Sequence, residues 1–354
     1  MATAQPGSSP RSQSSFGSQG PNIAASPQDV AEAAAQARTE IEAHEDFSDA
    51  GYDSDDNGSM TTSVSSSVRD YNFENGRRYH KFCEGRYIFP NDEQEQDRED
   101  MKHAMTVAVC GDKLHFAPVG SDPSRVLDLG TGTGIWAVDM GDTYPSAEII
   151  GVDLSPIQPS FVPPNVRFLV DDIESEWVYS APFDLIHARA MAPAIKDWHK
   201  VLTSALNWLT PGGYIEIQEL DFMPKTDDNS IPPDWAYLKY TAAVRDGLKE
   251  FGSDFHVGGK IPEKLRAAGF RNITTHQIKV PIGPWAKNQL LRTAGLYMQA
   301  AVIDAFNMGL NGPITKGLGW SRDEAEVLCA EGRKAIRNPK VHAYYTLWVV
   351  YGQK

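Results

Sequence analysis

The sequence predicts an α/β fold with a mostly parallel sheet that has helices on both of its faces. Short runs of branched apolar residues alternate with longer amphipathic segments through the middle of the 354-residue chain, as a doubly wound sheet requires. The first of these runs ends in a turn with Gly130, Gly132 and Gly134, and a helix is expected from Ile135. Such a turn lets a ligand lie against bare backbone at a helix N-terminus, where unpaired N–H groups favour a carboxylate or phosphate.

Residues 1–68 are expected to form a disordered acidic tail, because they are rich in Ser, Gly and Ala and nearly lack branched apolar side chains. They contain ten acidic residues and two arginines, so the tail accounts for −8 of the net charge of −14. Ser26 and Asp29 form an S-x-x-D capping box before an Ala-rich run to about His44. Its thin apolar stripe favours a transient helix over the alternative, a docking helix for a partner protein.

Residues 69–120 are expected to form an N-terminal cap segment on the main domain. Aromatic residues become frequent here, which marks the start of packed structure. A helix should begin at a cap residue, Asn91 or Asp92, and reach about Val109. Acidic residues in its first turn suit the positive end of the helix dipole.

Residues 121–354 should form the domain that carries the sheet. Its last strand is expected to run antiparallel to its neighbour, at or near the sheet edge. A helical insertion over about 287–337 precedes that strand, and its apolar residues recur at helical spacing. Packing on the core explains this stripe more simply than a substrate lid or a partner interface does. The expected strands lie near 124–129, 148–153, 166–170, 183–187, 213–219, 273–280 and 344–351.

Acidic residues end the first three strands, at the edge of the sheet where ligands gather in such folds. Asp128 precedes the first glycine by two residues, where its carboxylate can hold a cationic amino group. Asp153 follows about 20 residues later, the spacing at which a carboxylate takes both hydroxyls of a ribose. Asp172 ends the third strand and is placed to accept from an adenine amino group. A ligand with ammonium, carboxylate, ribose and adenine groups satisfies all of these positions, which predicts S-adenosylmethionine.

A glycine-rich turn alone is also typical of dinucleotide-binding folds, and Gly132, Gly134 and Ala137 fit their G-x-G-x-x-A spacing. The acids at the strand ends and the antiparallel last strand favour S-adenosylmethionine over a nicotinamide dinucleotide. The cofactor-binding residues predicted on this basis are Asp128, Gly130, Thr131, Gly132, Gly134, Asp153, Leu154, Asp172 and Ile173.

Several segments closely resemble the fungal LaeA-like family of class I S-adenosylmethionine-dependent methyltransferases. They are VLDLGTGTGIWAVDM, GVDLSPIQPSFVPPNVRFLVDDIESEW and FDLIHARAM, an upstream block within residues 74–98, and residues 347–352. The resemblance covers about residues 70–354, and the upstream block makes it specific to the family. It implies a Rossmann-like seven-stranded sheet with an antiparallel last strand, and a helical cap that closes over the cofactor.

The same resemblance suggests that Tyr79, Tyr87 and Arg98 act in the cap, where it shapes the acceptor pocket. An aromatic helix packed on the sheet explains these residues equally well. No N/D-P-P-Y run of the kind found in amino-methyltransferases follows the fourth strand. The nine histidines lack the close spacing of metal ligands, so no metal site is expected.

His187 is the candidate general base, because it lies near the carboxyl end of the fourth strand and histidine titrates in the useful range. A base is needed only if the acceptor must lose a proton, since the sulfonium methyl is already activated. A hydrogen-bonded structural histidine is the simpler explanation. Arg189, two residues later, is placed to orient an anionic substrate or to pair with a carboxylate.

Composition excludes several classes of protein. The chain outside the tail has a net charge of −6, so no direct nucleic-acid binding is expected. No apolar run approaches ~18 residues, so we expect no membrane span. The three cysteines lie far apart and suit a reducing compartment. An intracellular protein is therefore expected, in the nucleus, the cytoplasm or both, with nuclear residence implied by the resemblance alone.

The resemblance implies a regulatory methyltransferase that acts with protein partners, such as velvet-type regulators, on development or secondary metabolism. The alternative is a biosynthetic enzyme that methylates an oxygen or nitrogen of a small molecule. A third possibility is a cofactor-binding scaffold without turnover. The sequence leaves the methyl acceptor, protein or small molecule, open.

Overall fold

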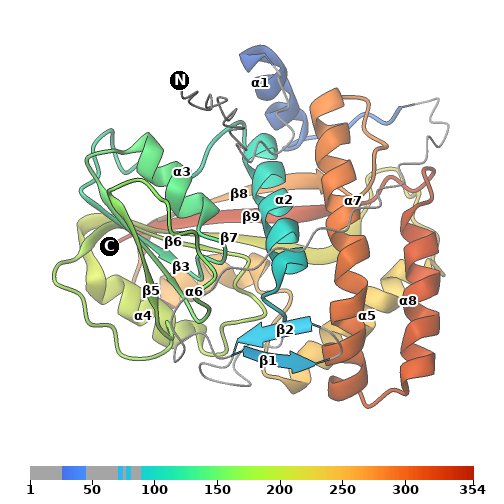
Figure 1. Cartoon of the computed structure of the whole chain (residues 1–354). Helices are drawn as coiled ribbons and strands as arrows, with labels where there is room; N and C mark the ends of the chain where they lie inside the picture. Colours follow the sequence, from blue (N-terminus) through green and yellow to red (C-terminus); the bar gives the residue numbers. More distant parts are fainter. Residues whose placement is uncertain (1–25, 45–70, 75–76, 81–88) are drawn as a thin grey trace, which may run out of the picture.

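The computed structural model describes residues 26–44, 71–74, 77–80 and 89–354. Its centre is a seven-stranded sheet in the order β5-β4-β3-β6-β7-β9-β8 (Figure 1). Strands β3 to β7 pair in parallel, and β9 runs antiparallel to both β7 and β8. The strands are β3 (Arg125–Leu129), β4 (Glu148–Asp153), β5 (Val166–Val170), β6 (Phe183–Arg189), β7 (Leu209–Lys225), β8 (Arg271–Pro281) and β9 (Tyr344–Gln353).

This sheet confirms the predicted fold class, a class I methyltransferase sheet with an antiparallel last strand. The central strands β3, β4 and β6 are buried on both faces, which explains why they read as continuous apolar runs. The last strand, β9, is inserted between β7 and β8, so β8 forms the edge of the sheet. The pairing of β7 with β6 has a register shift near its start, because Leu209 pairs with Phe183 and the next pair is Tyr214 with Leu185.

Helices cover both faces of the sheet (Figure 1). Helices α4 and α6 pack on one face, and α3 packs on the other. On that second face α2 lies between α3 and α7, and α5 and α8 extend the same apolar cluster. The helices are α1 (Pro27–Gln36), α2 (Glu93–Val109), α3 (Ile135–Thr143), α4 (Trp198–Trp208), α5 (Ala236–Glu250), α6 (Ile261–Ala268), α7 (Gln289–Gly309) and α8 (Arg322–Ile336), with a 3-10 turn at Gly258–Lys260 and a π-helical segment at Leu310–Gly317.

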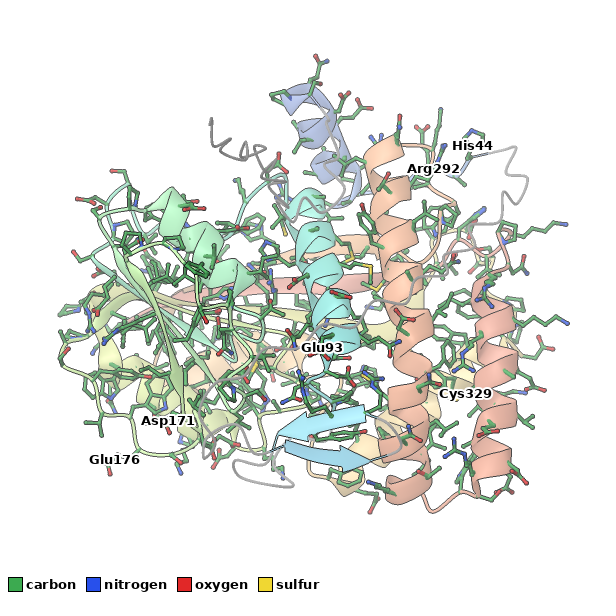
Figure 2. The ribbon with its side chains drawn as sticks, in the orientation of Figure 1. His44, Glu93, Asp171, Glu176, Arg292 and Cys329 are labelled. Carbon is green, nitrogen blue, oxygen red and sulfur yellow. The ribbon has the colours of Figure 1, made fainter. Side chains whose placement is uncertain are left out.

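The described part of the cap consists of α2 and a short hairpin that the sequence did not predict. The hairpin joins β1 (Tyr71–Glu74) to β2 (Arg77–His80). Asp92 caps α2 by accepting from the backbone N–H of Glu95, as predicted, and it also pairs with Arg77 at 2.8 Å. Figure 2 shows Glu93 at the end of α2 that lies beside the hairpin. These ion pairs hold the hairpin against the start of α2.

Residues 26–44 correct the expectation of a disordered tail. The predicted capping box is present at Ser26, but the helix ends at Gln36, and Val30, Ala33 and Ala37 on its apolar stripe are buried. The following residues run beside the edge strand, where Lys279 N–H donates to the carbonyl of Ala37. Tertiary packing supplies the stability that an isolated short helix lacks. The other residues of 1–68 lie outside the described part of the chain.

The helical insertion contains α7 and α8, as predicted. The apolar stripe of α7 is buried, so it packs on the core. No helix in the described part of the chain is both long and apolar enough to cross a bilayer. The buried stripe residues are Leu290, Leu291, Ala294, Met298, Val302 and Phe306.

Candidate functional site

The glycine-rich turn joins β3 to α3 at the carboxyl edge of the parallel strands. Gly130, Gly132 and Gly134 all have positive φ, at +66°, +57° and +85°. A Cβ atom on Gly130 would lie 2.2 Å from Met191, and one on Gly134 would lie 2.4 Å from Phe168. A Cβ atom on Gly132 would meet no described atom within 4 Å. The outer two glycines therefore allow close packing, and space beside the backbone is left open only at Gly132.

Asp153 lies at the end of β4 and contacts this turn. Its Oδ2 accepts from the N–H of Gly132 at 2.9 Å, and its Oδ1 accepts from the N–H of Ser155 at 2.9 Å. Burial raises the pKa of Asp153 to about 6, although these two N–H groups act in the opposite direction. A carboxylate oxygen can accept two hydrogen bonds, so each oxygen retains capacity for a ligand hydroxyl.

Asp128 is buried in β3 between two partners. Its Oδ1 lies 2.7 Å from Nδ1 of His187, and its Oδ2 accepts from the Thr131 hydroxyl at 2.7 Å. The imidazole of His187 is fully buried and stacks on Trp136 with 3.7 Å between ring centroids. Burial lowers the pKa of His187, and Asp128 opposes that shift. These four residues line a cavity of about 60 Å³ beside the glycine turn.

A second and larger cavity, of about 220 Å³, shares Gly130 and Gly132 with the first. Asp172 also lines the larger cavity, and its Oδ1 accepts from the N–H of Glu174 at 2.9 Å. Of the nine predicted cofactor-binding residues, eight line one of the two cavities, and Gly134 packs against Phe168 instead. Those on the larger cavity are Gly130, Gly132, Asp153, Leu154, Asp172 and Ile173.

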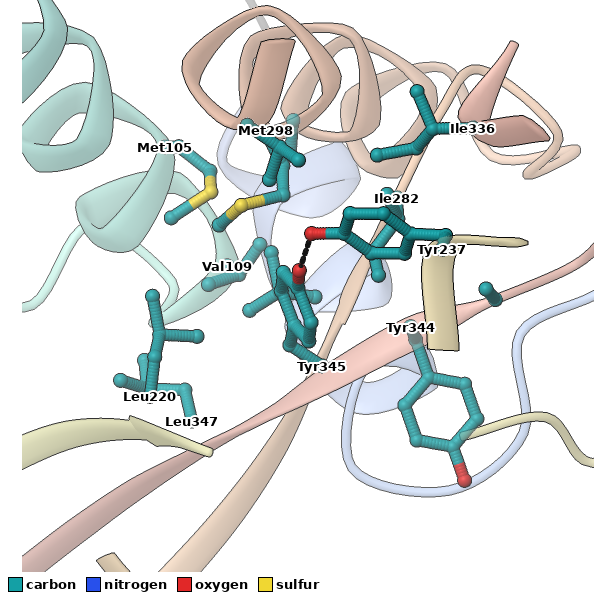
Figure 3. Close-up of a cluster of buried hydrophobic side chains, with 14 of the residues drawn as sticks. Met105, Val109, Leu220, Tyr237, Ile282, Met298, Ile336, Tyr344, Tyr345 and Leu347 are labelled. Carbon is teal, nitrogen blue, oxygen red and sulfur yellow. Dashed lines mark hydrogen bonds between the residues drawn. The ribbon is translucent and has the colours of Figure 1, made fainter. Parts of the chain in front are cut away.

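The other end of the larger cavity is apolar and aromatic. Helix α5 supplies Tyr237 and Tyr240, α7 supplies Met298 and Val302, and β9 supplies Tyr345. Figure 3 shows the hydroxyl groups of Tyr237 and Tyr345 hydrogen-bonded to each other beside Met298. Burial raises the pKa of both phenols, so they stay protonated. The helical insertion thus packs on the core and also forms one wall of the cavity.

Charged side chains of α2 and β6 lie along the same cavity. Arg98 donates to Glu95 at 3.0 Å, and Lys102 donates to Glu99 at 2.9 Å. Nη2 of Arg189 lies 2.9 Å from the buried His103. These are three cationic side chains among the lining residues, against seven carboxylates. The acidic lining favours a ligand with net positive charge.

The predicted cap residues have different outcomes. Arg98 lines the larger cavity, Tyr79 lies in the hairpin and is not among the described lining residues, and Tyr87 lies outside the described part of the chain. Two contacts between the α2 region and the loops of the site were not predicted from the sequence. Asn91 donates to the Ser155 hydroxyl at 3.1 Å, and the Thr133 hydroxyl donates to Asp100 at 2.6 Å.

Glu219 in β7 also lines the site, although it was not predicted from the sequence. It lines the larger cavity, and its Oε1 accepts from the N–H of Met191 at 2.6 Å. Burial raises the pKa of Glu219 to about 8. Its signal in the sequence was an acidic residue within the run from Tyr214 to Leu220, most of which is apolar.

The two cavities fit S-adenosylmethionine. The molecule has a sulfonium and an ammonium charge against one carboxylate, which suits an acidic lining. Asp153 and Asp172 offer carboxylate oxygens for its ribose and adenine, and Gly132 leaves open space at the backbone between them and Asp128. In the part of the chain that the structure describes, no cluster of His, Cys, Asp or Glu could hold a metal ion.

Comparison with known proteins identifies the family. The model of a methyltransferase domain matches residues 101–275. The methyltransferase pytC of Aspergillus terreus is 39% identical over 300 residues, which cover 84% of this chain and 93% of that protein. The secondary metabolism regulator LAE1 of Cochliobolus heterostrophus is 35% identical, over 78% of this chain and 92% of its own. The regulator laeA of Aspergillus flavus is 34% identical, over 82% and 80%.

A solved S-adenosylmethionine-dependent methyltransferase of Geobacter sulfurreducens aligns with 72% of this chain and 90% of its own, at 16% identity and a TM-score of 0.40. That likeness is too low to support an inference. The relatives that match at 34–39% identity, over most of their length, are sufficient to assign the family. Together with the sheet and the cofactor cavities, they show that the chain belongs to the LaeA-like family of class I S-adenosylmethionine-dependent methyltransferases.

Proposed function

We propose that this methyltransferase regulates secondary metabolism. The observation that carries the proposal is the match to the regulators LAE1 and laeA, at 35% and 34% identity over 92% and 80% of their length. The matches cover 78% and 82% of this chain. The proposal therefore concerns the whole folded part of the chain and not the glycine-rich turn alone.

The cofactor, when bound, supplies a methyl group that is already activated by its sulfonium charge. The residues of the chain then have to orient the cofactor and the acceptor and exclude water. In this proposal Asp153 holds the ribose hydroxyls, Asp172 accepts from the adenine amino group, and Asp128 holds the ammonium group. Both oxygens of Asp128 already have a protein partner, which fixes the carboxylate before the cofactor arrives.

His187 serves in this proposal to position Asp128 and not to act as a base. Its Nδ1 is committed to Asp128, its ring is stacked on Trp136, and its burial favours the neutral imidazole. Arg189 reaches both cavities and forms a contact with His103, so it has a role in supporting the site from β6. Neither assignment needs an acceptor to be known.

Regulatory proteins of the velvet type are the proposed partners, and the nucleus or the cytoplasm is the proposed location. Both proposals rest on the resemblance to the LaeA-like family described in the sequence analysis. Because residues 26–44 pack on the domain, the deletion that tests the tail should remove only residues 1–25. Loss of partner capture in a pull-down with normal cofactor binding supports a docking role for the tail, and unchanged capture contradicts it.

A second candidate function is the methylation of a small molecule during biosynthesis. Two observations favour it: pytC, which is named as a methyltransferase, is 39% identical, and the larger cavity ends in buried aromatic side chains. The same cavity is compatible with a regulator whose product is a small signalling molecule. The acceptor therefore decides between the candidates.

Methyl-labelled S-adenosylmethionine tests both candidates in one experiment. The purified chain is incubated with cell extract, which is then separated into protein and organic-soluble fractions. A labelled protein band supports the regulator with a protein target, and label in the organic fraction supports a small-molecule acceptor. Label in neither fraction, with normal cofactor binding, contradicts methyl transfer and favours a scaffold. The variant Gly132→Arg, whose side chain would fill the open space at the turn, serves as the inactive control.

A further inference from the structure

We infer that the acceptor is a small, neutral, apolar molecule with a phenol or enol hydroxyl, and that Glu219 binds this hydroxyl and takes its proton. The inference rests on the methyl transfer proposed above and deepens it by naming the class of acceptor. It holds equally if the methylated product is a biosynthetic intermediate or a signal.

In the described part of the chain, the Glu219 carboxylate has one oxygen with a protein partner and one without. Its side chain is buried, with 1% of its surface exposed, and Met191 N–H occupies its Oε1. Oε2 has no hydrogen-bond partner among the residues that the structure describes. Buried polar atoms in folded proteins nearly always have a partner. Because Glu219 lines the larger cavity, a ligand in that cavity is the partner that its free oxygen can take.

Glu219 lies between the two ends of the larger cavity. Met191, which donates to Glu219, also packs so closely on Gly130 that a Cβ atom there would overlap its sulfur. The carboxylate is therefore one residue away from the glycine turn. The cavity also reaches Tyr345, which lies three residues from Trp348, the register partner of Glu219 on β9. A group bound by Glu219 lies at the junction between the cofactor end and the apolar end.

The charged side chains that line the cavity bear on the charge of the acceptor. The cationic side chains on the cavity are engaged by protein groups, since Arg98 pairs with Glu95 and Lys102 pairs with Glu99. The remaining cation, Arg189, contacts His103. Carboxylates outnumber cations in the lining, so an anionic acceptor is disfavoured.

The hydroxyl groups of the aromatic end are also occupied. Tyr237 and Tyr345 bond to each other, and the Tyr240 hydroxyl donates to the carbonyl of Ala305 at 3.2 Å. These side chains offer apolar ring surface, and in the Tyr237–Tyr345 pair only the hydrogen of the accepting hydroxyl is left to donate. Ligand pockets typically combine such surface with one or a few convergent polar atoms. Glu219 is the convergent polar group here, so a neutral apolar body with one hydroxyl satisfies the cavity.

The proposed step balances in atoms and electrons. The acceptor oxygen attacks the methyl carbon, the O–C bond forms, and the C–S bond breaks with its electron pair going to sulfur, which leaves S-adenosylhomocysteine. The hydroxyl proton moves to Oε2 of Glu219, and the O–H electron pair stays on the acceptor oxygen. Burial raises the pKa of Glu219 to about 8, which suits a base for a weakly acidic hydroxyl.

The groups around Glu219 set its response to pH. Lys102 of α2 lowers the pKa, as do the N–H groups that follow β6, but burial outweighs them. On β9 its register partner is Trp348, and a Cβ atom on Gly258 of the 3-10 turn would lie 3.5 Å from its Cβ; neither of these residues titrates. Methyl transfer that depends on the Glu219 carboxylate should therefore increase with pH and level off above about pH 8.

The test uses the full chain saturated with S-adenosylhomocysteine and measures binding of 1-naphthol by calorimetry. Above about pH 8, where Glu219 is ionised, the wild type should bind 1-naphthol, and Glu219→Gln should bind it at least about tenfold more weakly, because a hydrogen bond to a charged group is lost. Naphthalene, which lacks the hydroxyl, should bind both proteins equally. 1-Naphthoate should bind the wild type more weakly than 1-naphthol. Glu263→Gln, an exposed change on α6, should behave as the wild type does.

The proton transfer is tested with labelled S-adenosylmethionine and 1-naphthol. The wild type should transfer label with the pH dependence given above. Glu219→Gln should lose that pH dependence and at least about 100-fold in kcat/KM. Glu219→Asp should recover part of the lost kcat/KM. Failure of the wild type to label 1-naphthol, or the same pH profile in Glu219→Gln, overturns the role as base. Equal 1-naphthol affinity in wild type and Glu219→Gln, or no binding by the wild type, overturns the acceptor class.

Cofactor binding separates this inference from the proposal on which it rests. S-adenosylmethionine is titrated into the wild type and both Glu219 variants before 1-naphthol is used. Absence of binding by the wild type contradicts the cofactor site and the proposed function. Normal cofactor binding by all three proteins also shows that the variants are folded, so any loss of 1-naphthol binding then belongs to Glu219.

Discussion

At the residue scale, Asp128 depends on two neighbours for its orientation. His187 and Thr131 each contact one of its carboxylate oxygens at 2.7 Å, and Trp136 covers the imidazole. A buried carboxylate with fixed partners is preorganised for a cationic ligand group. Burial favours the neutral imidazole, and its Nδ1 contact with Asp128 fixes the orientation of the carboxylate.

His187→Ala should lower both stability and cofactor affinity, because it leaves Oδ1 of Asp128 buried without its partner. We expect a loss of about 3 kcal/mol in the free energy of unfolding and about tenfold in affinity for S-adenosylmethionine. Urea unfolding and calorimetry measure the two effects. His199→Ala, an exposed change on α4, is the matched control and should change neither. Normal cofactor affinity with lost turnover would instead identify His187 as the base.

Most of the residues predicted to bind the cofactor line the two cavities, because glycines and acids at strand ends are local signals. The sequence did not separate Gly132 from Gly130 and Gly134, because the three look alike in the motif. Their difference comes from Met191 and Phe168, which pack on the outer two. The partner of Asp128 was also not predictable, since only the pairing of β3 with β6 brings His187 beside it.

At the scale of elements, α1 shows how a weak helix becomes part of the fold. The capping box was visible in the sequence, but the surface that receives the helix is assembled from α2 and α7, which are distant in the chain. Sequence periodicity does not report such a surface. The apolar face of α1 is consequently turned toward its own domain and is not available to a partner.

Ala33→Glu should destabilise the chain, because Ala33 is fully buried on α1 and the new carboxylate would have no partner there. We expect a loss of about 2 kcal/mol in the free energy of unfolding, measured in urea. Ala35→Glu lies on the exposed side of the same helix and should stay within about 0.5 kcal/mol of the wild type. Equal effects of the two changes would show that α1 does not pack as described.

Glu216 connects the segment before β3 to the centre of the sheet. Its Oε2 accepts from the N–H groups of Phe116 and Ala117 at 2.7 and 2.6 Å, and its Oε1 accepts from Gln218 at 2.8 Å. Burial raises the pKa of Glu216 to about 7 from an ordinary value of 4.5. The folded chain therefore binds this proton more tightly than the unfolded chain does. The stability from this group is complete below about pH 4.5 and is lost as the pH rises through 7.

Glu216→Gln should remove part of this pH dependence. Between pH 5 and 7.5 the wild type should lose about 2 kcal/mol more stability than the variant does, because glutamine does not titrate. Urea unfolding at both pH values measures the difference. Glu331→Gln, an exposed change on α8, should keep the wild-type dependence. The same pH dependence in all three proteins would contradict a proton held at Glu216.

At the scale of the whole molecule, individual strands and helices were predictable from the sequence, but their pairing and packing across the chain were not. Strands and helices were predicted close to their observed places, since their apolar runs and caps are local. The insertion of β9 between β7 and β8, and the hairpin before α2, depend on pairing between distant segments. The aromatic end of the cavity likewise combines α5, α7 and β9. The aromatic end of the cavity was therefore harder to predict from the sequence than the residues of the glycine turn.

Calorimetric titration of S-adenosylmethionine into the wild type, Gly132→Arg and Gly319→Arg tests the central claim, a cofactor site at the glycine turn, most directly. Both glycines have positive φ, at +57° and +70°, and a Cβ atom on either would meet no described atom within 4 Å. The backbone strain of the two substitutions is therefore similar, about 1–2 kcal/mol. The wild type and Gly319→Arg should bind the cofactor alike, and Gly132→Arg should lose at least about 100-fold in affinity. Equal affinity in all three proteins would contradict the assigned site.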